Sequence, residues 1–556
     1  MKQIFTFILI LTFSSCSFLD FDETAGLKSK EDMYKYYNSV EQMLTNVYSY
    51  MPNNLTSTTM RDCGCDDAEN GNSASEYQYF NNGTWSAINT VDDSWSLYHG
   101  VRAANGFIEE IGNVDLSRYE HDAQYDNWMK KMAFFPYEAR VLRANYFFEL
   151  ARRYGDIAMP LGVLDIPGAN AISKTAFADV INFIVEECDS CANHLPETYQ
   201  GQPGNQIGRM TKGYAMALKS KALLYSASPL HNSNGDVELW KRSASAALDI
   251  INMNIYSLDK TDCVNRPDSP EVVMAVIGGD SGTFEQNNFP IRFTEGARTG
   301  ATAVFPSQNL VDAFETVGGY KVTLAENGWH SEDPAFDPAA PYDGRDPRFY
   351  RAVLADGMEF KGKTIETFKG GADDAEVTAG GTPTGYFLMR YIQESTNFTP
   401  NQLVTNKHHW IVYRYAETLL SYAESMANAF PSDMSHTDSD YPYSAIWALN
   451  QVRANAGMPQ IPLCGYEEFI ERLQSEWRVE FAFEDHRFWD VRRWKIGDKT
   501  QKELAAVKII KAEDGTLNYY RQIYETRKWT DKMYLYPIPQ TELHKNQNLY
   551  PQNPGW

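Results

Sequence analysis

Acidic and basic side chains alternate with aromatic rings between residues 476 and 494, where the sequence reads Glu-Trp-Arg-Val-Glu-Phe-Ala-Phe-Glu-Asp-His-Arg-Phe-Trp-Asp-Val-Arg-Arg-Trp. Two carboxyl groups at a fixed separation are what glycoside hydrolysis requires. Arginine forks, however, also hold carboxylates bidentately inside proteins while rings fill the core. The chain has 73 acidic residues, so close pairs of acids are unavoidable. We therefore favour the structural interpretation of this stretch.

Two further patterns could carry chemistry. Gly279-Asp280-Ser281-Gly282 is similar to the nucleophile loop of serine proteases, but Thr283 replaces the final glycine. The surrounding sequence also does not predict the double β-barrel that supplies the matching histidine and aspartate. His408 and His409 could bind a metal, but the side chains of adjacent residues do not converge on one helix face. We therefore predict a protein that is not an enzyme, with no cofactor and no metal site.

Six cysteines follow residue 16, and three interpretations of them stay open. They are Cys63, Cys65, Cys188, Cys191, Cys263 and Cys464. The two close pairs could supply four thiolates to zinc, although their mixed spacing is a weak signal. An oxidising compartment would permit disulfides, and buried free thiols are the third interpretation. Cys188 and Cys191 fall in a helical stretch with no strand before it, which argues against a thioredoxin-type redox motif.

The amino terminus predicts the compartment. A short positively charged region, residues 1–3, precedes an apolar run from Ile4 to Phe13. This run is about half the ~20 residues that span a bilayer, so it is typical of a signal peptide. Ser14-Ser15-Cys16 closes it and resembles the lipobox of bacterial lipoproteins. We expect residues 1–15 to be a signal peptide, Cys16 the lipid attachment site and residues 16–30 an acidic tether. An ordinary cleavage site beside an unrelated cysteine is the alternative.

Composition narrows the class of partner. The formal net charge is −23, and nucleic acids and anionic membranes require a basic face, so neither is expected as a partner. Hydrophobic residues make up 43% of the chain and charged residues 22%, which is typical of a globular protein. Aromatic residues make up 13%, and rings beyond those needed for the core could form a binding face.

Helical periodicity dominates the elements that must position these residues. Apolar residues at positions 141, 144, 148 and 151 form one stripe, with Gly155 as a helix stop, and Thr211 can cap the next such helix. The pattern returns over residues 240–251, 413–427 and 446–457. Small residues on the stripes and an Ala-x-x-x-Phe spacing are typical of tetratricopeptide-type repeats. Because the intervals are irregular, we predict a mostly α fold: an irregular helical-repeat scaffold with a large insertion of loops and short strands.

Two segments break the helical pattern, residues 52–91 and residues 259–408, and both contain clusters of turn-forming residues. Such segments on a helical scaffold usually hold binding residues. A glycan requires rings to stack on and polar side chains for its hydroxyl groups. The candidates for ligand contact are Asp62, Asp66, Asp67, Tyr77, Tyr79, Trp85, Phe284 and Trp329. Packing within the loops is the alternative role for these side chains.

Six blocks along the chain resemble the SusD/RagB family. They are residues 139–160 (with Ala-Arg-Val-Leu-Arg-Ala-Asn-Tyr-Phe-Phe-Glu-Leu and Tyr-Gly-Asp), 208–225 (from Gly-Arg-Met-Thr-Lys), 306–314 (from Pro-Ser-Gln), 414–424 (Arg-Tyr-Ala-Glu-Thr-Leu-Leu-Ser-Tyr-Ala-Glu), 450–457 (Asn-Gln-Val-Arg-Ala-Asn-Ala-Gly) and 535–556 (Leu-Tyr-Pro-Ile-Pro to Gln-Asn-Pro-Gly-Trp). The blocks occur in the family's order over nearly the whole mature chain. Each block alone would be weak, but together they are highly specific.

The resemblance implies one SusD-like domain over residues 31–556, with four helix pairs of the tetratricopeptide type. It also implies a lipoprotein anchored in the outer membrane of a Bacteroidetes cell and facing the exterior. Such proteins pair with a TonB-dependent β-barrel transporter of the SusC type, capture oligosaccharides, or in some branches peptides, and are not enzymes. Binding of peptides with the same partner, or a surface glycoside hydrolase, are the alternative functions. The family's ligand-contacting residues vary, so the resemblance assigns none.

Overall fold

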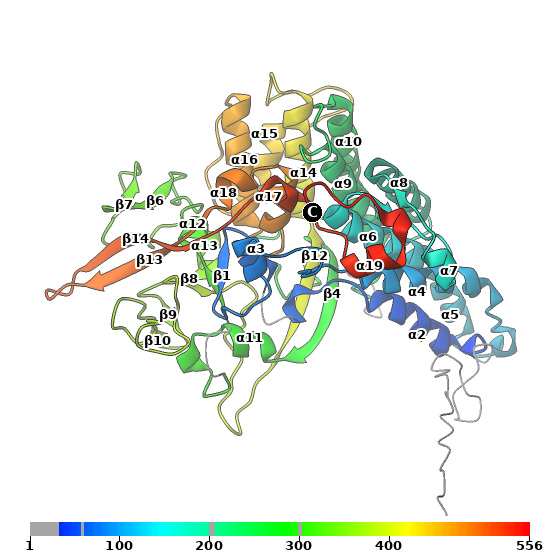
Figure 1. Cartoon of the computed structure of the whole chain (residues 1–556), viewed down its shortest axis with the longest axis horizontal. Coiled ribbons are helices and arrows are strands. Elements are labelled where there is room, and N and C mark those ends of the chain that lie inside the picture. The colour runs from blue at the N-terminus through cyan, green and yellow to red at the C-terminus, as the bar shows by residue number, and fades with distance from the viewer. Residues whose placement is uncertain (1–32, 57–59, 200–205, 299–302) are drawn as a thin grey trace, which may run out of the picture.

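The computed structural model describes residues 33–56, 60–199, 206–298 and 303–556 (Figure 1). The predicted signal peptide, Cys16 and the whole of the predicted acidic tether lie outside the described residues. No helix in these ranges is long and apolar enough to cross a membrane.

Helices form most of the regular structure. Those of the repeat scaffold are α4 (Leu97–Glu110), α6 (Phe135–Tyr154), α8 (Phe177–Ala192), α9 (Lys212–Ala227), α10 (Val237–Met253), α14 (Tyr415–Ala429), α15 (Ala445–Asn455) and α16 (Tyr466–Glu480). The others are α2 (Tyr37–Tyr48), α3 (Gln78–Asn82), α5 (Tyr125–Met132), α7 (Ile166–Ala169), α11 (Thr283–Asn288), α12 (Gln308–Val311), α13 (Pro347–Ala352), α17 (Arg487–Arg493), α18 (Gly497–Thr500) and α19 (Gln540–Lys545).

Each scaffold helix packs on the next along the chain, so the eight make four pairs: α4 with α6, α8 with α9, α10 with α14, and α15 with α16. In Figure 1 they form one continuous stack. The prediction of a mostly α, irregular tetratricopeptide-type scaffold is therefore confirmed. Helices α10 and α14 are neighbours in the stack although the long insertion separates them in sequence.

The start of α9 and the end of α6 lie where the capping residue and the glycine in the sequence predicted them. Thr211 caps α9, because its side-chain oxygen accepts a hydrogen bond from the Tyr214 amide at 3.1 Å. Gly155 follows α6 with a φ of 70°, a conformation that a residue with a Cβ atom rarely adopts. Helix α6 is buried along most of its length, because a second apolar stripe, formed by Leu142, Tyr146, Leu150 and Tyr154, lies beside the predicted one.

Strands occupy the segments that break the helical pattern. They are β1 (Ala68–Asn70), β2 (Ile157–Ala158), β3 (Lys174–Thr175), β4 (Val272–Ser281), β5 (Val304–Pro306), β6 (Val322–Ala325), β7 (Gly328–Ser331), β8 (Val353–Leu354), β9 (Glu359–Phe360), β10 (Lys363–Thr364), β11 (Phe387–Leu388), β12 (Asn406–Arg414), β13 (Glu503–Lys511) and β14 (Leu517–Thr526). Within the described residues they form seven two-stranded antiparallel sheets.

Three of these strand pairs matter for the arrangement of the molecule. Strands β4 and β12 pair near the two ends of the long insertion, and β1 pairs with β5, which fastens the first irregular segment to the insertion. Strands β13 and β14 form a hairpin that projects away from the helical stack (Figure 1). One large core lies between α2, α4, α6, α8 and α9 and continues into the insertion, and a second lies between α10, α14, α15 and α16.

Candidate functional site

Seven of the eight residues that the sequence nominated for ligand contact are buried. Their exposed fractions are 1% for Asp62, 3% for Asp66, 0% for Asp67, 5% for Tyr77, 2% for Trp85, 3% for Phe284 and 4% for Trp329. The expectation that these side chains reach the surface is therefore wrong. Tyr79, on α3, is 40% exposed and is the one nominated side chain that can meet a ligand from solvent.

The two central aspartates are buried because arginines from distant parts of the chain cover them. Asp66 pairs with Arg487 at 2.8 Å and with Arg478 at 3.0 Å, and Asp67 pairs with Arg478 at 2.7 Å. Burial alone would raise the pKa of Asp66, but the two guanidinium groups outweigh it and hold that pKa well below its usual range. These carboxylates are thus occupied by structural ion pairs.

The nominated rings fill cores instead of a binding face. Trp85 meets Phe80, Tyr536 and Trp556 edge-on, with ring centroids 4.7, 5.1 and 4.5 Å away. Trp329 packs edge-on against Tyr342 at 5.8 Å. Glycine and asparagine around residue 80 predicted an open loop, but the carboxyl-terminal segment, which lies far away in sequence, covers it.

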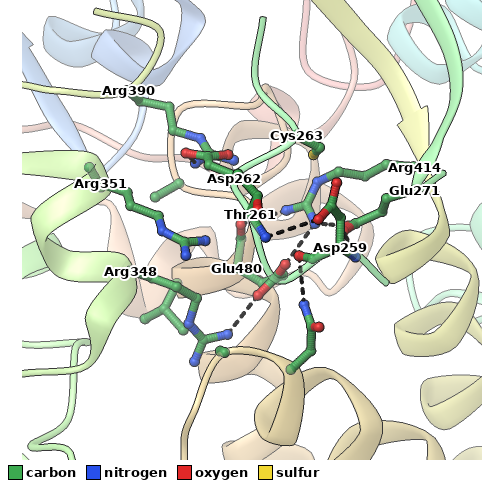
Figure 2. Close-up of a pocket in the computed structure, with 15 residues that line it drawn as sticks. Asp259, Thr261, Asp262, Cys263, Glu271, Arg348, Arg351, Arg390, Arg414 and Glu480 are labelled. Atoms are coloured by element: carbon green, nitrogen blue, oxygen red, sulfur yellow. Dashed lines mark hydrogen bonds and ion pairs between the residues drawn. The ribbon is translucent and has the colours of Figure 1, made fainter. Parts of the chain in front are cut away.

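Figure 2 shows a cavity lined by charged side chains where the insertion meets the helical stack. Arg414, at the end of β12, pairs with Glu271 and Glu480 at 2.6 Å each and with Glu484 at 2.9 Å. Arg348, on α13, also reaches Glu480, at 2.7 Å. Burial raises the pKa of Glu480, but Arg414 and Arg348 outweigh it and lower that pKa to about 2.

This cavity has a volume of about 30 Å³, enough for one or two water molecules but not for a sugar. Its carboxylates and three of its four arginines are already in ion pairs, and the fourth, Arg351, donates to the Lys260 carbonyl oxygen at 3.2 Å. The cluster therefore holds the insertion against the helices and has no room for a sugar. The structural interpretation of residues 476–494 is confirmed, because Glu476, Arg478, Glu480, Glu484, Arg487 and Arg493 all lie in buried ion pairs.

The serine pattern does not assemble into a catalytic triad. His408 has its Nε2 atom 2.8 Å from a carboxylate oxygen of Glu285 and its Nδ1 atom 3.2 Å from the Asn406 carbonyl oxygen. With both ring nitrogens engaged, His408 has none left to accept a proton from Ser281. The Ser281 hydroxyl instead donates to the Thr283 hydroxyl at 3.1 Å.

Five of the six described cysteines are buried, and Cys65, Cys188, Cys191, Cys263 and Cys464 are free thiols, as the third interpretation predicted for them. Among the described residues no cluster of three or more histidine, cysteine or acidic side chains is placed to hold a metal ion.

An open surface remains at the start of the first irregular segment, and we call it the β1 surface. It consists of Asn72, Ser73, Tyr79 and Asn82 around β1 and α3, with Tyr524 from β14. Tyr79 is 40% and Tyr524 45% exposed. The end of β14 lies beside α3, because the Lys528 amide donates to the Asn81 carbonyl oxygen at 2.8 Å. Exposed rings and small polar side chains together are suited to the faces and hydroxyl groups of a sugar.

Buried charges hold the base of this surface. Glu69 on β1 accepts a hydrogen bond from the Gln78 amide and pairs with Arg527 at 2.9 Å, and Arg527 also pairs with Glu525 at 2.6 Å. Burial, helped by the nearby Glu525 carboxylate, raises the pKa of Glu69 to about 7, although Arg527 opposes the shift. Sequence reasoning missed Tyr524, because only the tertiary structure brings β14 next to α3.

The fold defines a class of protein: a helical-repeat scaffold that carries irregular segments, one of which exposes most of the β1 surface. Residues 270–556 match the model of the SusD family, and the chain belongs to that family.

Known proteins agree with this assignment. The chain is similar to SusD-like protein P2 of Formosa agariphila, with 24% identity over the whole of both chains. It is also similar to the solved structure of a SusD-like protein from Bacteroides fragilis, with 25% identity, a TM-score of 0.77, and coverage of 95% of this chain and 99% of the other. A SusD-like carbohydrate-binding protein from the same species matches with 21% identity, a TM-score of 0.72, and coverage of 93% and 100%.

Proposed function

We propose that the protein is a cell-surface lipoprotein that captures oligosaccharides and delivers them, uncleaved, to a TonB-dependent β-barrel transporter of the SusC type. Membership of the SusD family carries this proposal. A structural relative described as carbohydrate-binding supports the ligand class. The lipid on Cys16 would hold the protein at the outer membrane, facing the exterior.

We infer that the β1 surface contacts the glycan, with Tyr79 and Tyr524 as the stacking rings. Both rings are exposed, and polar side chains that can accept or donate hydrogen bonds surround Tyr79. A few stacking and hydroxyl contacts give modest affinity, on the order of micromolar to millimolar. No assembled catalytic pair accompanies these rings among the residues that make up the β1 surface.

Calorimetric titration of the purified protein with a panel of oligosaccharides tests the proposal. Loss of one stacking ring costs about 1 kcal/mol, so Tyr79→Ala and Tyr524→Ala should each weaken binding roughly fivefold. Tyr320→Ala is the matched control, because Tyr320 is 42% exposed but lies beside α16, where its neighbour Lys321 contacts Glu471. Normal binding by both variants would contradict the β1 surface. Binding of peptides alone would favour the peptide alternative, and release of shorter sugars would overturn the non-enzymatic function.

A further inference from the structure

Exposed aliphatic side chains gather on the short loop between β2 and α7 and on the first residue of α7. Leu161 is 53%, Val163 40% and Ile166 77% exposed. Aliphatic groups that stay in contact with water lose the free energy that burial would provide. A cluster of them on a short loop is therefore typical of a surface that a partner covers.

Side chains of α4 hold the loop in place through hydrogen bonds to its backbone, so the three aliphatic side chains are exposed in a fixed conformation. Asn105 on α4 donates to the carbonyl oxygens of Pro160 at 2.9 Å and Gly162 at 3.0 Å. Arg102 donates to the Leu164 carbonyl oxygen at 2.6 Å, and Glu109 accepts from the Val163 amide at 2.8 Å. Because these bonds satisfy the backbone, the outward-facing side chains are left pre-organised for contact.

A cleft of about 330 Å³ lies on the inner side of the same loop. Trp95, Tyr98 and Leu164 supply part of its apolar walls, and Leu549 closes it from the carboxyl-terminal segment. The lining residues of the loop alternate with the exposed ones: Gly162 and Leu164 line the cleft, whereas Leu161 and Val163 project outward. We call the cleft, its rim and the three exposed aliphatic residues the docking face.

Two basic side chains on α4 stand at the rim of the cleft. They are His99 and Arg102, three residues apart and therefore on one side of the helix. Glu542 and Lys545 on α19 also line the cleft, but they pair with each other at 2.8 Å. Across the described ranges, neither His99 nor Arg102 has a carboxylate within ion-pairing distance, although Arg102 donates to the Leu164 carbonyl oxygen. In a chain with a net charge of −23, unpaired basic groups beside an apolar cleft favour an occupant that offers a carboxylate next to an apolar side chain.

The position of the predicted tether indicates that the occupant belongs to the membrane side of the molecule. The described chain begins at Met33 and enters α2, and α2 packs against α4. Figure 1 places α2, α4, α5 and α7 at the same end of the helical stack. Sixteen residues separate Cys16 from Met33, so the two residues lie at most about 60 Å apart. The lipid anchor would therefore hold this end of the molecule near the membrane.

We propose that the docking face receives an extracellular segment of the partner transporter, one that presents an apolar side chain beside a carboxylate. This inference rests on the proposed transporter partnership and adds the surface that makes it. The apolar side chain enters the cleft, the carboxylate meets Arg102 and His99, and Leu161, Val163 and Ile166 pack against the rest of the segment.

Co-purification from detergent extracts at native expression tests the proposal. The double variant Val163→Asp/Ile166→Asp should recover at least about tenfold less barrel than the wild type, because an unpaired charge cannot be buried at an apolar contact. Leu403→Asp/Leu463→Asp is the matched control, since Leu403 and Leu463 are 67% and 63% exposed on other parts of the molecule. It should recover the barrel normally. Equal melting temperatures for all three proteins establish that each is folded.

Photo-crosslinking in cells provides the second measurement. A photoreactive amino acid at position 166 should give an adduct of barrel mass, and the same group at position 463 should not. An adduct with lipid or glycan alone, or normal barrel recovery by the Val163→Asp/Ile166→Asp variant, would overturn the docking face while leaving the partnership intact. Failure of the wild type to recover any barrel would overturn the proposed partnership, and the inference with it.

Discussion

Trp85 packs against the rings of Phe80, Tyr536 and Trp556. At the scale of single residues, its substitution tests whether this ring cluster is part of the hydrophobic core. Trp85 is 2% exposed, and truncation of a buried tryptophan to alanine costs about 3–5 kcal/mol. We therefore expect Trp85→Ala to lower the free energy of unfolding by that amount, measured by chemical denaturation. Tyr79→Ala, in the same segment but 40% exposed, should leave stability almost unchanged. Equal stability of the two variants would contradict the buried position of Trp85.

Glu69 gives a pH-dependent prediction at the same scale. Burial raises its pKa from 4.5 to about 7, so between these values the folded protein holds a proton that the unfolded chain has released. The stability that Glu69 contributes is present below about pH 4.5 and is lost as the pH rises through about 7. Relative to Glu69→Gln, the wild type should therefore lose stability between about pH 5 and about pH 8.

Denaturation of both proteins at the two pH values measures this difference. Glu332→Gln, at an exposed position, serves as the control and should follow the wild type at both pH values. A stability difference between wild type and Glu69→Gln that does not change with pH would show that the Glu69 carboxyl ionises alike in the folded and unfolded protein.

At the scale of elements, the attachment of the insertion to the helical stack depends on Arg414. This residue ends β12 and pairs with Glu480 at the end of α16. Loss of one partner from a buried ion pair costs about 3–5 kcal/mol, because the remaining charges stay buried and unpaired. Arg414→Ala leaves Glu271 without its arginine partner and weakens the pairing of Glu480 and Glu484. We expect lower global stability and faster amide hydrogen exchange in residues 259–408. Arg472→Ala breaks an exposed ion pair on α16. It should change the free energy of unfolding by no more than about 0.5 kcal/mol and leave hydrogen exchange in residues 259–408 unchanged.

At the scale of the whole molecule, the amino-terminal anchor determines where the binding and docking faces can act. Cys16→Ala should release the protein from the membrane fraction, because the described helices include none that spans a bilayer and one lipid-bearing residue is the expected anchor. Cell fractionation and lipid labelling measure this. Retention of the variant in the membrane with continued labelling would contradict the role of Cys16. Protease accessibility on intact cells separately tests whether the protein faces outward.

Periodicity and capping in the sequence determined the helical scaffold. The apolar stripes of α6, the cap at Thr211 and the stop at Gly155 are local features, and each has its predicted role. Their physical basis is short-range: the helix repeat brings residues three and four apart onto one face, and caps satisfy nearby backbone groups. The alternation of acids and arginines over residues 476–494 likewise predicted structural ion pairs. An arginine side chain matches a carboxylate in geometry, and this holds whichever acidic residue the fold brings to it.

Which of the candidate side chains are exposed, and so the make-up of the proposed binding surface, was decided only by the tertiary structure. Asp66 and Trp85 lie in a segment whose glycines and asparagines predict exposure, yet Arg487 and Trp556, more than four hundred residues further along the chain, cover them. Tyr524 comes to the same part of the molecule as Tyr79 because the chain just after β14 lies beside α3, where the Lys528 amide donates to the Asn81 carbonyl oxygen. Local composition determines how the backbone turns, but the exposure of a side chain depends on which distant segment packs over it, and that is settled by the burial of the whole core.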